Sequence, residues 1–437
     1  MKKVVLIGLL ITMVLTLLVS VACSSSTSST TSNAPAASTA PAAAATTAAQ
    51  SSASAATTSA AAATKTLKIG VICWTGFFVG VDMVHGLELM VEMDNANGGI
   101  DIGGEKYKVE LVEYDSNNTQ ATEVAAVNRL VYEDKVNIII ASPSYASSWL
   151  SITEQNKVLV FAYSPDTTSI LDAKYKYVYS ANFMNDIAPI FAGWFAKAHA
   201  DVTSKIVIPV PDNQFGHGNA AKETAAWQVF GVTPVVYYYP ATQTDLSAVA
   251  TKVVSQNPTA VYPLGMDMSI LKALFEAGYK GQIFADNTSP LLTLAKMVPV
   301  AALEGYIGGA WPLEFDTIPS DLKEAQAFKT AWIAKYQKWE GPEVVDVANY
   351  ACLKAAMQQT GSLDIDKLAD ALGNGLKYES PTGFGQMINR TDLGIDRTMD
   401  SITSMSIKQV VNGQPVLVAT VPLEDALNSV RATYPAK

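Results

Sequence analysis

The fold is decided by residues 64–115, which read TKTLKIGVICWTGFFVGVDMVHGLELMVEMDNANGGIDIGGEKYKVELVEYD. Apolar residues first alternate, as they do in a strand, then recur at helical spacing, and alternate again after the pair Gly98-Gly99. These three patterns are carried by Leu67, Ile69 and Val71, by Met83, Leu87, Met90 and Val91, and by Tyr107, Val109 and Leu111. A βαβ unit is therefore predicted, which implies a parallel sheet covered by helices, with ligands bound outside the carboxyl ends of the strands.

The same alternation of strands and helices continues along the chain. Further strands are expected near residues 136–141, 158–163, 177–180, 205–210, 234–239, 260–264 and 282–285. Helices are expected near residues 148–157, 186–199, 218–230, 245–256 and 268–277, and three more near 320–339, 344–360 and 364–372. Asn412-Gly413 predicts a type I′ turn between two final strands, 402–411 and 415–421. Because residues 65–437 exceed the roughly 250–300 residues of one core, we predict an α/β fold of two doubly wound, three-layer lobes.

The N-terminus has the pattern of an export signal. Lys2 and Lys3 precede an uncharged apolar run, residues 4–22, which ends directly before Cys23. An uncleaved membrane anchor is the alternative, because this run is long enough to span a bilayer.

The residues around Cys23 resemble a bacterial lipoprotein signal, in which a small residue precedes the cysteine and small polar residues follow it. The resemblance implies a signal peptide over 1–22, lipidation of Cys23 and anchoring to the outer face of the cytoplasmic membrane. Residues 24–64 hold no charged residue and are rich in Ser, Thr and Ala. Residues 23–64 are therefore expected to be a lipid-anchored, disordered linker.

The sequence lacks the motifs of common catalytic, nucleotide and metal sites. No GxxxxGK[ST], HExxH, GxSxG or CxxC pattern occurs, and His85, His199 and His217 are scattered without metal-ligand spacing. We therefore expect no enzyme activity, no cofactor and no metal. Acidic residues outnumber Lys and Arg by 40 to 30 and no basic stripe occurs, so nucleic acid is not an expected partner.

A GxGxxA pattern at residues 216–221 follows a predicted strand. A dinucleotide site also needs an acidic residue at the end of the next strand, where the chain has Tyr239-Pro240. We interpret the glycines as a tight turn at a helix N-terminus. Cys73 and Cys352 form either a disulfide or two buried free thiols, and we favour the free thiols.

Several segments, in order, carry a family resemblance. They are IGVICWTG, EMDNANGGIDIGGEKYKVELVEYD, RLVYEDKVNIII, SPDTT, YKYVY, PDNQFGHG, TQTDLSAV, NPTAVYPLG and NGQPVLV. Together they resemble the branched-chain amino-acid (leucine/isoleucine/valine) type of ABC-transporter substrate-binding protein, over the whole of residues 65–437.

The resemblance implies the type I periplasmic-binding-protein fold, with two lobes joined by three crossing segments. We expect these crossings near residues 181–186, 312–316 and 379–383. Lobe I would comprise residues 65–183 plus 313–381, and lobe II residues 184–312 plus 382–437. Closure of the hinge around a ligand between the lobes is the expected mode of binding.

The resemblance also assigns ligand contacts. In the family, residues after two first-lobe strands hold the ligand's carboxylate and amino groups, an aromatic residue precedes a second-lobe glycine, and an acidic residue meets the ammonium. The corresponding positions are Ser144 and Tyr145, Thr167 and Thr168, Phe215, and Asp286 or Asn287.

Four aromatic residues, Trp74, Tyr145, Tyr163 and Phe215, lie at or just past predicted strand ends. Each one either caps the core or faces the cleft. If two or more face the cleft, they offer a flat apolar surface with few polar groups. The ligand is then a small amino acid or carboxylate with an apolar or aromatic side group.

The leading functional prediction is a non-enzymatic solute receptor that delivers its ligand to the permease and ATPase subunits of an ABC importer. A ligand-sensing module of the same fold is the alternative. A secreted hydrolase is a third class, but it needs a nucleophile and a base that the sequence does not supply.

Overall fold

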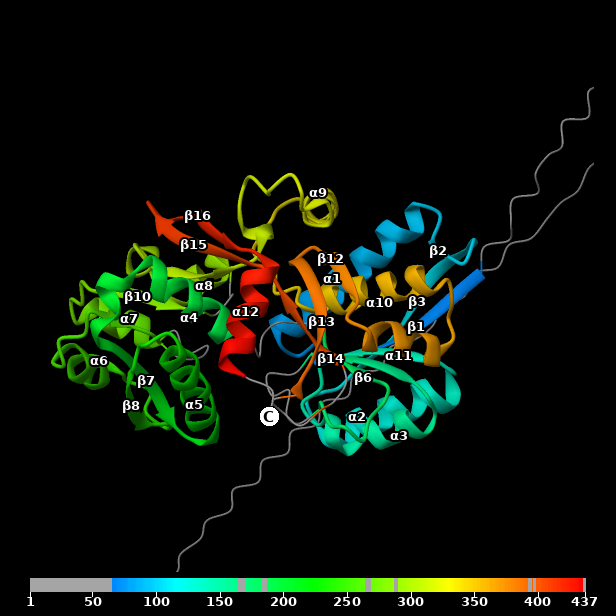
Figure 1. The fold of residues 1–437 in the computed structure, drawn as a ribbon, viewed down its shortest axis with the longest axis horizontal. Helices are drawn as coiled ribbons and strands as arrows, with labels where there is room; N and C mark the ends of the chain where they lie inside the picture. The colour runs from blue at the N-terminus through cyan, green and yellow to red at the C-terminus, as the bar shows by residue number, and fades with distance from the viewer. Residues whose placement is uncertain are drawn as a thin grey trace, which may run out of the picture. The chain divides into compact units, whose positions relative to one another are not determined.

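The computed structural model describes residues 65–163, 170–181, 187–263, 269–286, 290–391, 395 and 398–434. They form three β-sheets and the helices that pack on them (Figure 1). The predicted α/β class is confirmed.

The first sheet has six strands in the order β2-β3-β1-β4-β5-β6. β1 pairs in parallel with β3, from Lys65 opposite Tyr107 to Cys73 opposite Asp115, and helix α1 (Phe78–Ala96) lies between them in sequence. The predicted βαβ unit is therefore confirmed. The strands are β1 (Lys65–Cys73), β2 (Ile100–Ile102), β3 (Glu105–Asp115), β4 (Ile138–Ala141), β5 (Leu159–Ala162) and β6 (Val178–Tyr179).

Helices from two distant parts of the chain cover this sheet. α2 (Gln120–Asn128) and α3 (Leu150–Gln155) contribute Val127 and Leu150 to the core on one face, whereas α1 contributes Met83 and Leu87 to the core on the other. α9 (Lys323–Tyr336) and α10 (Asp346–Thr360) contact α1, although they follow it by more than two hundred residues. The chain therefore returns to the first sheet late in its course.

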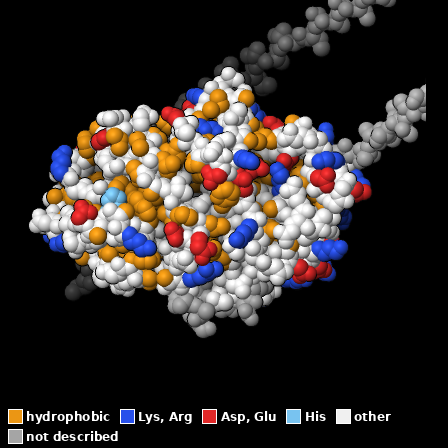
Figure 2. All heavy atoms as spheres, turned by 45° about the horizontal axis from the view of Figure 1, so that its top comes forward, with side chains coloured by type: hydrophobic (Ala, Val, Ile, Leu, Met, Phe, Trp, Pro, Cys, Tyr) orange, Lys and Arg blue, Asp and Glu red, His pale blue; other side chains and the backbone are white. Residues whose placement is uncertain are grey.

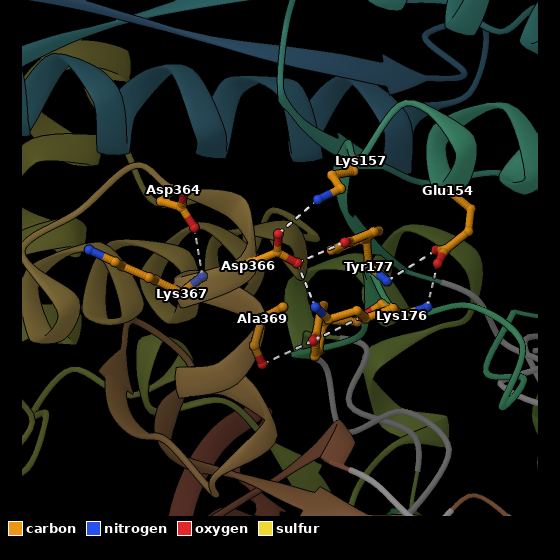
Figure 3. Close-up of polar contacts among 9 residues, drawn as sticks. Glu154, Lys157, Lys176, Tyr177, Asp364, Asp366, Lys367 and Ala369 are labelled. Atoms are coloured by element: carbon orange, nitrogen blue, oxygen red, sulfur yellow. Dashed lines mark hydrogen bonds and ion pairs between the residues drawn. The ribbon is translucent and has the colours of Figure 1, made fainter.

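Charged side chains attach α11 (Ile365–Gly373) to the segment that leads into β6 (Figure 3). The Asp366 carboxylate accepts hydrogen bonds from Lys157 Nζ at 2.9 Å, Lys176 Nζ at 2.5 Å and the Tyr177 hydroxyl at 2.8 Å. From the other side, Glu154 of α3 accepts from the backbone amides of Lys176 and Tyr177, at 2.9 and 3.2 Å. These contacts fix the last strand of the sheet between two helices.

The second sheet has seven strands in the order β16-β15-β11-β10-β9-β7-β8. Its strands from β7 to β11 pair in parallel, and the final two are antiparallel. Asn412 and Gly413 both have positive φ, 53° and 72°, so the predicted type I′ turn is confirmed. The strands are β7 (Ile206–Asp212), β8 (Val235–Pro240), β9 (Ala260–Val261), β10 (Gln282–Ala285), β11 (Ile307–Ala310), β15 (Met405–Val411) and β16 (Gln414–Val421).

Six helices accompany the second sheet. α12 packs against α4 and α5, and α6 packs against α7. They are α4 (Ile187–Ala198), α5 (Gln214–Val229), α6 (Ser247–Val254), α7 (Ser269–Glu276), α8 (Leu291–Met297) and α12 (Leu423–Thr433).

A third, antiparallel sheet was not predicted. It consists of β12 (Lys377–Ser380), β13 (Gly383–Asn389) and β14 (Thr398–Thr403). The tight turn between β12 and β13 lies within residues 379–383, where the sequence predicted a crossing segment. The chain passes from the third sheet to the second at Ser404, so the single strand predicted over 402–411 is wrong and is divided between two sheets.

Two glycines bring helix N-termini close to the strands before them. A Cβ at Gly80 would lie 1.9 Å from the Trp74 carbonyl oxygen, and a Cβ at Gly216 would lie 1.9 Å from the Pro211 carbonyl oxygen. Gly216 and Gly218 do lie at a helix N-terminus, as predicted, but they belong to the helix itself, because α5 begins at Gln214 rather than at residue 218. In both sheets, a helix therefore starts tightly against the carboxyl end of a central strand.

On the face drawn in Figure 2, basic and acidic side chains are interspersed with apolar ones. This face therefore presents no large field of one sign. Cys73 and Cys352 are buried and free, as favoured from the sequence. Among the described residues, no helix combines the length and apolar character that crossing a membrane requires.

Candidate functional site

An exposed aromatic group lies where β1 ends and α1 begins. Trp74, Phe77 and Phe78 are 36%, 39% and 42% exposed. The rings of Trp74 and Phe77 stack at 5.6 Å with an interplanar angle of 17°, and the Phe77 and Phe78 ring centroids are 4.6 Å apart. Because these three neighbouring aromatic side chains are each more than a third exposed, they offer a contact surface for an apolar ligand.

The turn that carries Trp74 is held by Asp115 at the end of β3. Thr75 donates two hydrogen bonds to this carboxylate, from its amide at 3.4 Å and from its hydroxyl. Burial alone raises the pKa of Asp115, but the hydrogen bonds from Thr75 and Asn117 outweigh it and hold the pKa below its ordinary value. Asp115 therefore stays ionised and fixes the position of the aromatic group.

The loop after β4 contains Ser144 and Tyr145, and a buried side chain already binds it. The Glu123 carboxylate accepts from the amides of Ser144 and Tyr145, at 2.8 and 3.1 Å, and from Trp149 Nε1 at 3.0 Å. The Ser144 hydroxyl donates to Asn118 Oδ1 at 2.6 Å. These donors are thus engaged inside the protein, whereas the Tyr145 side chain is 41% exposed.

A second buried carboxylate, Asp346 of α10, lies behind the end of β4. It accepts from the Ser142 hydroxyl at 3.0 Å and from Asn349 Nδ2 at 2.9 Å. Burial raises the pKa of Asp346 to about 6, and the two hydrogen bonds limit the rise. Burial likewise raises the pKa of Cys73 to about 12, so this thiol is no nucleophile at neutral pH. Burial, with Glu343 and Asp346 nearby, raises the pKa of Tyr163.

The second sheet has its own acidic group at the carboxyl ends of β9 and β10. The Tyr262 hydroxyl lies 2.9 Å from Glu223 Oε1 and also bonds to Asp286 Oδ1. Burial and the charge of Asp286 raise the pKa of Glu223 well above its ordinary value. One hydroxyl proton cannot serve two carboxylates, and the raised pKa of Glu223 favours its protonated form.

Most predicted site residues that the structure describes lie at strand ends. Trp74, Ser144, Tyr145 and Tyr163 follow β1, β4 and β5 of the first sheet, and Asp286 follows β10 of the second. Thr167, Thr168, Asn287 and Cys23 lie outside the described residues, as does the side chain of Phe215. Their roles, and those of the described residues as ligand contacts, stay predictions.

Sequence reasoning missed Phe77, Phe78, Glu123, Glu223 and Asp346. The aromatic pair directly follows the Trp74-Thr75-Gly76 turn, and that position was a usable signal. Asp346 is the one charge in the run from Val344 to Ala351, which also signals a buried polar role. Nothing in the helical patterns of α2 and α5 distinguishes Glu123 or Glu223 from a solvated residue. No group of three His, Cys, Asp or Glu side chains in the described part of the chain is arranged to hold a metal ion.

Both α/β sheets carry polar and aromatic groups at the carboxyl ends of their strands, the edge at which folds of this class bind ligands. Residues 66–400 match the family described as periplasmic binding protein, and the chain belongs to that family. The family consists of extracytoplasmic substrate-binding proteins.

Three solved structures share the fold at low sequence identity. A leucine-binding protein, LivK, from Thermotoga maritima is 21% identical, with a TM-score of 0.62 over 82% of this chain and 99% of that chain. The substrate-binding protein LivJ from Streptococcus pneumoniae, in complex with isoleucine, is 18% identical, with a TM-score of 0.63 over 82% and 99%. A solute-binding protein from R. palustris, in complex with benzoate, is 18% identical, with a TM-score of 0.61 over 82% and 97%. The predicted type I periplasmic-binding-protein fold is confirmed.

Proposed function

We propose that this chain is the solute receptor of an ABC importer and binds a small amino acid or aromatic carboxylate without chemical conversion. The exposed aromatic group of Trp74, Phe77 and Phe78 carries the proposal, because it lies at the strand edge where this fold binds ligands. Solved relatives hold isoleucine or benzoate, ligands that combine a carboxylate with an apolar group.

The ammonium group and the carboxylate of the ligand have separate candidate partners. Asp286 at the end of β10 supplies a carboxylate for an ammonium group. The amides of Ser144 and Tyr145 already donate to Glu123, so a ligand carboxylate depends on other donors, for which Thr167 and Thr168 are the proposed residues. Tyr145 and Tyr163 complete the proposed contacts in the first lobe, and Phe215 in the second.

The export and delivery steps belong to the same proposal. Lipidation of Cys23 and the linker up to residue 64 would hold the receptor at the outer face of the cytoplasmic membrane, within reach of its permease. A labelled fatty acid is expected to be incorporated into the wild type and not into Cys23→Ser. A wild-type protein that takes up no fatty acid yet remains in the membrane fraction would favour an uncleaved anchor instead.

A thermal-shift panel tests the ligand class. L-leucine, L-isoleucine, L-phenylalanine, benzoate and 4-hydroxybenzoate would be compared with glucose and maltose, since a ligand that binds only the folded form raises the melting temperature. At least one amino acid or aromatic acid is expected to raise it. Stabilisation by the sugars alone would contradict the proposal.

A further inference from the structure

A continuous series of hydrogen bonds, partly buried at Ser142 and fully buried beyond it, runs from the end of β4 to the residues after β6. The Ser142 hydroxyl donates to Asp346 Oδ2 at 3.0 Å, and Asn349 Nδ2 donates to Asp346 Oδ1 at 2.9 Å. Asn349 Oδ1 in turn accepts from the Ala181 amide at 2.9 Å. Asp346, Asn349 and Ala181 are at most 1% exposed, so water does not compete for these bonds.

The series of hydrogen bonds continues beyond Ala181 into the third sheet. The Tyr378 hydroxyl lies 2.9 Å from the Ala181 carbonyl oxygen and 2.7 Å from Ser401 Oγ. Ser401 lies in β14, which contacts β6 and leads through Ser404 into the second sheet (Figure 1). Both backbone polar groups of Ala181 are therefore held by side chains, one from α10 and one from β12.

The part of this hydrogen-bond series between Ser142 and Ala181 joins two different regions of the first sheet. Ser142 directly follows β4, at the edge of the sheet that carries the aromatic group. Ala181 is the last described residue before the chain leaves the first sheet for α4 and the second sheet. Two side chains, Asp346 and Asn349, are the only links between Ser142 and Ala181 along these three bonds.

We propose that Asp346 and Asn349 are positioning residues that couple the ligand edge at Ser142 to Ala181, the point where the chain leaves the first sheet. The inference deepens the proposed function, since it rests on that function for the meaning of Ser142 as the ligand edge. It assigns α10 a role beyond covering the sheet: its first turns transmit the position of the binding edge to the connection between the sheets.

Hydrogen exchange of the Ala181 amide, resolved to single residues in the intact, ligand-free protein, tests the coupling. Asp346→Ala removes the acceptor that orients Asn349, and we expect Ala181 exchange to accelerate about fivefold, the change that corresponds to one hydrogen bond of ~1 kcal/mol. Asp346→Asn retains an acceptor for Asn349 and a donor for Ser142, so it is expected to keep the wild-type exchange rate. A variant that merely destabilised the core would not be rescued in this way.

A second pair of variants tests the hydrogen-bond series from the end that Ser142 forms. Ser142→Ala is expected to accelerate Ala181 exchange, whereas Ser148→Ala is not, because Ser148 donates to the Tyr145 carbonyl oxygen and lies outside the series. Wild-type exchange in Ser142→Ala, or equal acceleration in Ser148→Ala, would overturn the inference even if Asp346→Ala did not fold. Failure of the proposed ligand class would not alter these rates, because no ligand is present.

Discussion

The most quantitative prediction concerns the replacement of Asp346 by Asn. The Asp346 side chain is 1% exposed and has no cationic partner among its hydrogen bonds, which come from Ser142 and Asn349. Burial raises its pKa from 3.8 to about 6. Because the folded pKa exceeds the unfolded pKa, the stability that Asp346 contributes is fully present below pH 3.8 and is lost as the pH rises through 6.

The size of this effect follows from the shift. A difference of about 2.2 pKa units at 1.36 kcal/mol each gives about 3 kcal/mol in total, of which about 2 kcal/mol is lost between pH 4.5 and 7.5. The amide side chain of the Asp346→Asn variant cannot ionise; its oxygen accepts from Asn349, and its NH2 group can donate to the Ser142 hydroxyl, which then acts as the acceptor. The variant is therefore expected to gain about 2 kcal/mol relative to the wild type over this pH range.

Urea denaturation of both proteins at half-unit intervals from pH 4.5 to 7.5 measures this difference. All other titrating groups are common to the two proteins, so their contributions cancel when the free energies of unfolding are subtracted. A difference that does not change with pH would refute the buried, ionising state of Asp346.

Three further predictions concern the stability of other sites. Lys408→Met leaves the Glu314 carboxylate without the buried ammonium group that lies 2.8 Å away, so the free energy of unfolding measured in urea is expected to fall by about 3–5 kcal/mol. Adding Glu314→Gln is expected to restore part of this loss. An unchanged urea midpoint in Lys408→Met would contradict the prediction. Gly80→Ala and Gly216→Ala are expected to lower the melting temperature, because each new Cβ would meet a backbone carbonyl oxygen. Gly218→Ala in α5 is the control: a Cβ there meets nothing within 4 Å, so the free energy of unfolding is expected to rise by up to about 1 kcal/mol. Hydrogen bonds from Lys176, Lys157 and Tyr177 lower the pKa of Asp366, so its contribution is present above its unfolded pKa and is lost as the pH falls. The melting-temperature difference between the wild type and Asp366→Asn should therefore shrink from pH 6 to pH 3. A constant difference would count against the hydrogen bonds of Asp366 drawn in Figure 3.

The strands of the first two sheets could be predicted because their apolar residues follow simple patterns. The third sheet could not, since β14 buries the polar residues Asp400, Ser401 and Thr403 beside a single described apolar residue, Ile402. Asp400 is neutralised by Arg390 at 2.5 Å and Ser401 bonds to Tyr378. A strand whose buried positions are mostly polar has no alternation that periodicity can detect.

The residues of the candidate site were predictable only in part, because some of its contacts join residues that are far apart in the sequence. Trp74 and Tyr145 were predicted from their places at or just past strand ends, whereas Asp286 was predicted from the family resemblance. The Ser142–Asp346 bond joins residues 204 positions apart, and the Glu223–Tyr262 bond joins residues 39 apart. Each pair joins a residue at a strand end to a residue of a distant helix, and a single sequence carries no signal for how that helix packs on the sheet.

Isothermal titration of the intact protein with the amino-acid and aromatic-acid panel tests the central claim most directly. At least one ligand is expected to bind at a single saturable site, and Trp74→Ala should weaken that binding by about tenfold or more, because it removes a stacked aromatic contact. Tyr132→Ala is the matched control, since Tyr132 is equally aromatic, 48% exposed and bonded to Asn156 away from the strand ends. Equal affinity in the wild type and Trp74→Ala, or saturable binding of a sugar alone, would contradict the account.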